Sequence, residues 1–478
     1  MSKTAEPLKW WMYFSVILVG LIAFWPSVWF DFVNWDDPAY VIENDLIKGW
    51  SAENLIGVAS ETVTRNYAPL TIFSFLIDHT LWGTNPCGYH ATNVLLHLIN
   101  GVLVLLLVRQ LSGSNFVGWM TAALFLVHPV QIETVAWISS RKGLLSATFM
   151  LSALLVRLKP AEEDSRDGLY IAWLIAALLS KALAVVLPAI VLCYDVWVYR
   201  RKFSDALARQ IIPGFLCVIL LLKTMASQTS VMGGLRGHMD LSLLQILAVD
   251  ATILWRYLGM LFWPQNLCVL YDPPTTGITG LVTLAVAGWA VVGLFIWKIR
   301  KSVPTVLWAA ATFLLLLAPV LNFYKITTLM NDRYLYLPCL VVFGFTAATL
   351  NRLLSAAPET SWTLSRLTAS LRWGVAMTAV ACATVATAGH LPVWQSPETL
   401  WAHAMSEVPQ LPVVRIQMAL TQHDRGQRRE AIRTLQWALF KTEPDELDRR
   451  RMTRMIKDWS AELQVRNVAN RLIETPSQ

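Results

Sequence analysis

Long apolar runs, separated by short polar stretches, recur along the chain as far as His390. A helix that crosses a bilayer needs about 20 predominantly apolar residues. The pattern therefore predicts an all-α membrane domain with about eleven transmembrane helices. These predicted spans lie near residues 11–30, 89–108, 116–136, 169–180, 182–199, 210–227, 281–297, 303–320, 336–354 and 373–390, with one more that ends at Arg157.

Basic residues at the ends of the runs predict the orientation, because cytoplasmic flanks are enriched in Lys and Arg. Lys3 and Lys9 precede the first span, so we expect a cytoplasmic N-terminus and a retained span instead of a cleaved signal. The run at 281–297 also ends in basic residues and must therefore begin outside. Residues 228–279 then stay outside, and the run Leu241–Trp263 is expected to be an interfacial or re-entrant helix.

This topology predicts three outer segments, which are residues 31–88 (outer loop one), 228–279 and 321–335. Amphipathic helices are expected on this outer face. The composition changes after the membrane domain, residues 1–390, since residues 391–478 are rich in charge and contain no run of span length. We expect these residues to form a small helical domain on the outer side, with the C-terminus outside.

A helical hairpin is predicted within this second domain, over Val413–Thr442. Apolar positions recur there at intervals of three and four, Gly426 lies at the turn, and Pro444 ends the second helix. The pattern resembles one tetratricopeptide (TPR) unit. A single unit cannot bury its own apolar face, so the hairpin is expected to pack on neighbouring helices, and it is a candidate surface for a protein partner.

Composition supports a membrane protein. Hydrophobic residues make up 55% of the chain and charged residues only 15%, against about 25% charged residues in soluble domains. The formal charge of +7 is spread along the chain, so no basic block indicates nucleic-acid binding. The six cysteines have no metal-binding spacing. Cys87 and Cys268 both fall in outer segments, so a disulfide between them is one open alternative.

The first polar cluster is the adjacent pair Asp36 and Asp37, just beyond the first span. Neighbouring carboxylates are costly unless they meet a cation, basic side chains or a hydroxyl that they activate. A helix cap followed by Pro38 explains the pair equally well. The pair is therefore both a candidate catalytic base and a candidate helix cap.

A second cluster combines His128 and Glu133 with Arg141 and Lys142 at the outer end of a span. An unpaired carboxylate is costly at that depth. One interpretation is a structural network in which His128 and Glu133 support one another or Arg141. The functional alternative is that Arg141 and Lys142 bind an anion while Glu133 orients one of them.

Two further candidates are Lys181, between two short apolar runs, and Arg333 beside Tyr334 and Tyr336. Lys181 either extends to the surface or binds a carboxylate, carbonyl groups or a phosphate. Arg333 and the tyrosines either belong to an interfacial aromatic belt or clamp a phosphate and a sugar. Together with Arg65, these basic groups lie on the predicted outer face and suit an anionic, lipid-linked donor.

Several motifs resemble the transmembrane-and-TPR family of GT-C glycosyltransferases. They occur in the family's order over nearly the whole chain and cover residues 35–44, 67–70, 82–86, 88–97, 128–142 and 332–338. The resemblance implies a GT-C membrane domain that transfers a sugar, typically mannose, from a polyprenyl phosphate to a protein hydroxyl. It also implies supporting roles for His90 and Tyr67. Ala68 and Ala182 depart from the family pattern, and the short repeat region suggests a bacterial inner-membrane member.

The predicted mechanism is an inverting transfer to Ser or Thr of an exported protein. Asp36 or Asp37 acts as base, with Asp36 favoured, and Arg141, Lys142, Lys181, Arg333, Tyr334 and Tyr336 bind the donor. No cofactor is required, although Asp36 and Asp37 are the candidate ligands should Mg²⁺ or Mn²⁺ take part. The alternatives are an oligosaccharyltransferase with a diphosphate-linked glycan, a non-enzymatic scaffold and a transporter. The clustering of charge at one face disfavours a transporter.

Overall fold

The computed structural model describes residues 7–64, 66–158, 167–229, 241–303, 305–323, 328–355, 362–442 and 444–474. Over these residues the chain is helical, and the only β pairing is an isolated bridge between Val63 and Asn66. Within the described part, five helices are long and apolar enough to cross a membrane, or six if one bent pair counts as a span. The chain is an integral membrane protein, and the finer prediction of eleven spans stays a prediction.

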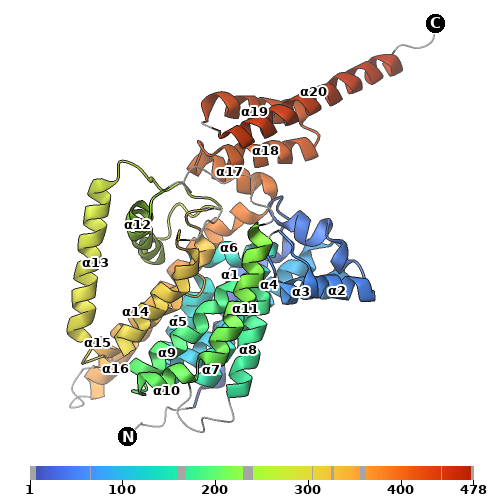
Figure 1. The fold of residues 1–478 in the computed structure, drawn as a ribbon. Helices are drawn as coiled ribbons and strands as arrows, with labels where there is room; N and C mark the ends of the chain where they lie inside the picture. The colour runs from blue at the N-terminus through green and yellow to red at the C-terminus, as the bar shows by residue number, and fades with distance from the viewer. Residues whose placement is uncertain are drawn as a thin grey trace.

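Most of the long helices run side by side in one bundle, and α13 (Thr279–Ile299) stands to one side of it (Figure 1). The helices of the bundle, with the short α6 and α10 at its ends, are α1 (Trp10–Phe24), α4 (Pro86–Ser112), α5 (Asn115–Val127), α6 (Ile132–Ala136), α7 (Arg141–Arg157), α8 (Asp167–Ser180), α9 (Leu187–Trp197), α10 (Phe203–Ala208), α11 (Ile211–Thr229), α14 (Thr305–Leu317), α15 (Cys339–Ser355) and α16 (Trp362–His390). The outer segments add α2 (Ala52–Ser60), α3 (Pro69–Trp82) and α12 (Leu243–Phe262), and the C-terminal part adds α17 (Pro397–Glu407), α18 (Pro412–Asp424), α19 (Arg428–Lys441) and α20 (Glu446–Glu474).

Each predicted span coincides with a described helix, but the third is broken. The helix axis bends by 57° between Asn115–Val127 and Pro129–Ala136. Pro129 has no N–H to continue the helical ladder, and it begins the 3₁₀ turn η4 (Pro129–Gln131). After the break, the chain continues through α6 in a new direction.

Helix α12 has span-like length and composition, whereas the sequence predicts an interfacial helix. In Figure 1 it is viewed almost end-on, while α13 and α14 are seen from the side, so α12 runs across the bundle direction. Two indole N–H groups join it to α13, since Trp255 donates to the Ala285 carbonyl and Trp289 to the Ala251 carbonyl, each at 3.0 Å.

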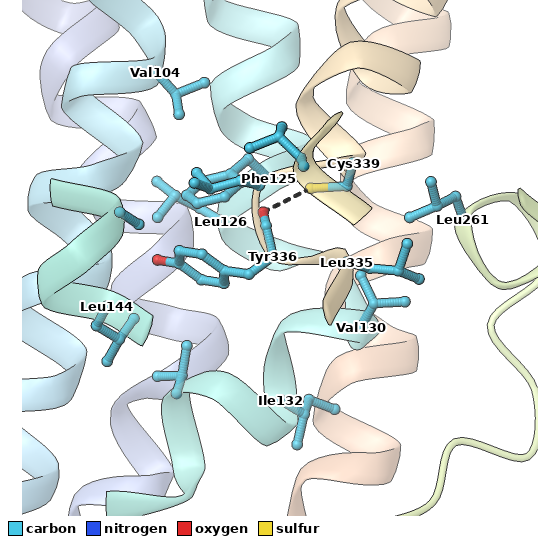
Figure 2. Packing of buried hydrophobic residues seen from close by; sticks show 14 of the residues in the cluster. Val104, Phe125, Leu126, Val130, Ile132, Leu144, Leu261, Leu335, Tyr336 and Cys339 are labelled. Atoms are coloured by element: carbon cyan, nitrogen blue, oxygen red, sulfur yellow. Dashed lines mark hydrogen bonds between the residues drawn. The ribbon is translucent and has the colours of Figure 1, made fainter. Parts of the chain in front are cut away.

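One large apolar core connects the bundle helices and continues into Trp394, Leu400 and Trp401 of the C-terminal part. Figure 2 shows its centre, where Phe125, Tyr336 and Cys339 lie together and the Cys339 thiol donates to the Tyr336 carbonyl at 3.1 Å. Because the core crosses residue 390, helix α17 packs as a continuation of the membrane part.

The hairpin predicted over Val413–Thr442 corresponds to α18 and α19 (Figure 1). Gly426 adopts a φ of +79° at the turn, a left-handed conformation that glycine adopts without steric cost. A separate apolar cluster joins the hairpin to Met452 and Trp459 of α20. The hairpin thus packs on neighbouring helices, and its identity as a TPR unit stays a prediction.

The cysteines form no disulfide in the structure. Cys87 and Cys268 are both free thiols, and Cys268 is buried.

Candidate active site

Asp37 is a buried hydrogen-bond acceptor that holds outer loop one against the bundle. Its carboxylate accepts the N–H groups of Val33 at 3.0 Å and Ser139 at 2.9 Å, and the Ser139 hydroxyl donates to it as well. It does not cap the short helical turn η2 (Pro38–Ile42) with its side chain. Burial outweighs these hydrogen bonds and raises the pKa of Asp37 to about 6.

Asp36 is the accessible member of the pair. The Asp36 side chain is 28% exposed, whereas the whole Asp37 residue is only 1% exposed. The Oδ2 atom of Asp36 lies 3.6 Å from Nζ of Lys142. Asp37 thus occupies the N-cap position before Pro38, but its side chain binds Val33 and Ser139 instead of capping the turn. Asp36 faces a cation at the surface.

Lys142 lies between aromatic rings at the start of α7. Its Nζ atom is 4.9 Å from the centre of the Tyr40 ring and 5.8 Å from that of Trp137. It also donates to the Tyr40 hydroxyl at 3.4 Å. The rings restrict the ammonium group to a position next to Asp36, where it is only 12% exposed.

Arg141 is buried and fully engaged inside the protein, in contrast to the expectation that it binds a donor. Its guanidinium donates to Asp78 at 2.5 Å, to Asn93 Oδ1 at 2.7 Å and to the Tyr89 carbonyl at 2.7 Å. Successive helical residues point about 100° apart, so burying Arg141 turns Lys142 toward the surface. Asp78 was not identified from the sequence, although a lone carboxylate in the apolar run of α3 was an available signal.

Glu133 binds Arg333, a pairing that the sequence analysis did not predict. Its carboxylate accepts the backbone N–H of Arg333 at 2.8 Å and pairs with the guanidinium. His128 does not join this pair, because its ring accepts from the Val130 N–H and meets the Leu261 carbonyl at 3.2 Å. The prediction that His128 and Glu133 support one another is therefore wrong. The prediction that Glu133 orients Arg141 or Lys142 is also wrong. The break at Pro129 separates the two side chains.

A recess opens beside these groups, with about 400 Å³ of empty space, part of it open to solvent. Lys181, Arg333 and Tyr334 line it, and so do the hydroxyl-bearing residues Thr134 and Ser146. The hydroxyls of Thr134 and Ser146 are buried and have no hydrogen-bond partner among the described residues. Unpaired buried hydroxyls and cations at one cavity suit a polar, anionic ligand.

Lys181 lies between α8 and the 3₁₀ turn η7 (Ala182–Val186). Burial and the nearby cations Lys142 and Arg333 lower the pKa of Lys181 to about 7. In the part of the chain that the structure describes, its ammonium forms no hydrogen bond or ion pair. An anion in the recess would relieve this repulsion.

The other predicted residues that the structure describes do not present free polar groups to the recess. Tyr336 borders the recess, but its hydroxyl is committed to His97 at 2.9 Å and Asn100 at 3.0 Å, so it is not free to bind a sugar. His90 is buried edge-on against the Phe30 ring. The Tyr67 hydroxyl donates to the Ala59 carbonyl, and Lys223 lies 3.8 Å from the centre of its ring. Arg65 falls outside the described residues.

The candidate metal ligands Asp36 and Asp37 do not fit a divalent cation. The Asp37 oxygens accept hydrogen bonds from Val33 and Ser139, and Asp36 faces Lys142. Over the described ranges, no group of three or more His, Cys, Asp or Glu side chains is placed to hold a metal ion.

The similar proteins that carry a functional name include several protein O-mannosyl-transferases. No protein-family model matches the chain. It is 27% identical over 201 residues to a protein O-mannosyl-transferase of Caenorhabditis elegans, covering 40% of this chain and 29% of that protein. It is also 30% identical over 204 residues to the human protein O-mannosyl-transferase TMTC4, covering 37% of this chain and 27% of the human protein. The predicted resemblance to these transferases is confirmed. The chain spans less than a third of the length of these relatives.

Two solved structures are also similar to the chain. An oligosaccharyltransferase of Archaeoglobus fulgidus, tethered to an acceptor peptide, has a TM-score of 0.48 at 12% identity, covering 91% of this chain and 60% of that one. ArnT of Cupriavidus metallidurans, bound to undecaprenyl phosphate, has a TM-score of 0.40 at 13% identity, covering 91% and 80%. With TM-scores below 0.5, these neighbours do not by themselves establish the fold.

Proposed function

We propose that the chain is a glycosyltransferase that moves a hexose, such as mannose, from a polyprenyl phosphate to a Ser or Thr hydroxyl of an exported protein. One observation carries the proposal. The accessible carboxylate of Asp36 lies beside Lys142, and the neighbouring cations Lys181 and Arg333 border a recess with unpaired hydroxyls. The named relatives, which are protein O-mannosyl-transferases, support the same reaction class.

In the proposed reaction, Asp36 takes the proton of the acceptor hydroxyl as its oxygen attacks the anomeric carbon. The bond between the anomeric carbon and the phosphate oxygen breaks in the same step. A single displacement inverts the anomeric configuration. We assign this role to Asp36 because Asp37 already accepts hydrogen bonds from Val33 and Ser139.

The phosphate leaves with more negative charge than it carried in the donor. Lys181 and Arg333 are proposed to hold it in the recess and to stabilise that growing charge. Glu133 fixes the Arg333 guanidinium, so little reorganisation is needed when the charge develops. Lys142 lies next to the base, and Tyr334 forms part of the wall against which the sugar binds.

Asp37 and Arg141 receive positioning roles. Asp37 links outer loop one to Ser139, two residues before Arg141. Arg141 is held by Asp78, and its burial turns Lys142 toward Asp36. Both groups thus support the site without contacting the substrate.

The proposal includes an orientation. Asp36 and the recess lie on the outer face if the N-terminus is cytoplasmic and eleven helices span the membrane. The helices α17 to α20 then lie outside, in the periplasm of a bacterial inner-membrane protein, where the α18–α19 hairpin is available to a protein partner.

Activity in proteoliposomes tests the proposal. The purified chain is supplied with polyprenyl-phosphate mannose and a Ser/Thr-containing peptide, and mass spectrometry detects an added hexose. Asp36→Asn should reduce turnover by roughly 10²–10⁴-fold, the usual contribution of a general base. Asp45→Asn is the matched control, because Asp45 is an exposed carboxylate of the same loop and pairs with Lys48 at 2.7 Å.

The same assay distinguishes a monophosphate donor from a diphosphate donor, and metal-independent transfer from metal-dependent transfer. Transfer from the monophosphate donor that persists in EDTA supports the proposal. Transfer only from a diphosphate-linked glycan, and only with a divalent cation, identifies an oligosaccharyltransferase instead. Full turnover of Asp36→Asn overturns the assignment of the base, and no transfer from either donor favours a scaffold.

A further inference from the structure

The loop that carries Asp36 is held by helices more than 360 residues away in the chain. The Asn34 side-chain amide donates to the Thr421 hydroxyl at 2.9 Å and to the Gln417 carbonyl at 3.3 Å, both on α18. The indole N–H of Trp401 on α17 donates to Asn34 Oδ1 at 2.6 Å. Two C-terminal helices therefore meet on one asparagine, two residues before Asp36.

The geometry specifies asparagine at this position. A carboxamide offers an acceptor at one end and two donors at the other. Here the acceptor end faces an N–H that can only donate, and the donor end faces a carbonyl that can only accept. An aspartate would lose the bond to the Gln417 carbonyl, and an isosteric leucine would lose all three bonds.

Two further contacts strengthen the attachment. The Trp35 ring packs on the Trp401 ring, with centres 5.3 Å apart. The backbone N–H of Asp31 donates to the Gln395 carbonyl at 3.0 Å, just before α17. The loop is thus bound to the C-terminal part by backbone, amide and aromatic contacts.

On its other side, the same loop is bound to the membrane part through Asp37 and Ser139. Asn34 and Asp37 are three residues apart and are held by opposite partners. Asp36 lies between them, and its carboxylate is the one that stays accessible. A displacement of either attachment would move Asp36 relative to Lys142.

We propose that Asn34 and Trp401 are positioning residues, through which α17 and α18 hold the catalytic carboxylate in place. The C-terminal helices are then part of the active site and not only a surface for partners. This inference rests on the proposed function for its effect on catalysis, but its structural part is testable without any activity.

The experiment uses the full chain in lipid nanodiscs with Asn34→Leu, Trp401→Phe and the double variant. Trp401→Phe keeps an aromatic ring against Trp35 and removes the N–H donor together with part of the indole ring. The matched control is Thr434→Val, which removes a hydrogen bond of 2.8 Å between α19 and α18 without contacting the loop.

The first readout is hydrogen exchange of the peptide covering residues 31–40. Loss of the Asn34 bonds should speed exchange there roughly tenfold, as expected for one or two net hydrogen bonds, while Thr434→Val leaves it unchanged. Unchanged exchange in Asn34→Leu and Trp401→Phe overturns the inference, whatever the activity.

The second readout is turnover. Each single variant should lower kcat about tenfold with an unchanged KM for the donor, since small misplacements of a reacting group slow the chemical step. The double variant should be no slower than the worse single variant, because both changes break the same contact. Additive losses, or a rise in KM for the donor alone, contradict a shared positioning role. Faster exchange in a chain whose wild type has no transferase activity supports the attachment and refutes the proposed function.

Discussion

Two charged clusters lie at opposite ends of the bundle and are built differently. At the end where α1 begins, Asp195 is buried between Arg157 at 2.7 Å and Arg201 at 3.6 Å. At the other end, Lys181 and Arg333 line the recess, and Lys142 lies 3.6 Å from Asp36. No described carboxylate pairs with Lys181.

The charges around Asp195 stabilise the fold, whereas the charges around Lys181 are available to a ligand. A buried carboxylate shared by two guanidinium groups is compensated within the protein. Cations that repel one another beside a cavity are held in place by the fold, and an anion in the cavity would compensate their charge. Removing a charge should therefore cost stability at one end and activity at the other.

The largest effect is expected from Asp195→Asn. Removing the carboxylate takes away the buried partner that Arg157 and Arg201 share. This should lower the free energy of unfolding by about 3–5 kcal/mol. Activity per folded molecule should not change. Unfolding in detergent can be followed by dye labelling of the buried thiols of Cys217, Cys268 and Cys339.

Asp167→Asn is the control for this change. Asp167 is 41% exposed and lies 3.9 Å from Arg157, so its loss should cost less than about 1 kcal/mol. Equal destabilisation by both variants would contradict the special role of Asp195.

The next effect is expected from Lys181→Met. Removal of one cation from the phosphate site should lower kcat/KM for the donor by roughly 10²-fold. The melting temperature should stay the same or rise, because a partly desolvated charge is lost. Lys48→Met, at an exposed pair with Asp45, is the control. A large drop in stability without loss of activity would make Lys181 structural.

A smaller effect is expected from pH. Since the pKa of Lys181 is lowered to about 7, the side chain is charged below pH 7 and loses its charge as pH rises through that value. Donor affinity should fall above pH 7, by at most about tenfold per pH unit. Lys181→Arg should abolish this dependence, because arginine stays protonated. A wild-type pH profile that Lys181→Arg leaves unchanged would assign the titration to another group.

The smallest effect is expected from Ser139→Ala. The pKa of Asp37 is raised from 3.8 to about 6, so the folded state holds this proton more tightly than the unfolded state. The associated stability is present below pH 4 and is lost as pH rises from about 4 to 6. Ser139→Ala removes a donor to the ionised form, at a cost of roughly 1 kcal/mol above pH 6. Thermal melts at pH 4 and pH 7 measure the difference, and equal changes at both values would contradict it.

Much of the helical framework follows from the sequence alone. Apolar runs and their polar ends predict the helices because a bilayer and a helical rise of 1.5 Å per residue set their length. The turn at Gly426 was predicted, because glycine adopts left-handed conformations without steric cost. The break at Pro129 was not predicted, although the missing N–H of proline was an available signal. Asp36, Lys181 and Arg333 were identified as candidates from polarity in apolar surroundings.

Only the tertiary structure decided the role of each candidate. Neighbouring residues point to different sides of a helix, so the sequence cannot tell that Arg141 is buried on Asp78 while Lys142 faces Asp36. Pairings between distant segments, such as Glu133 with Arg333, depend on how helices pack and leave no local pattern. The sequence by itself therefore determined where polar groups enter the membrane face, and three-dimensional packing determined which of them are satisfied and which remain available.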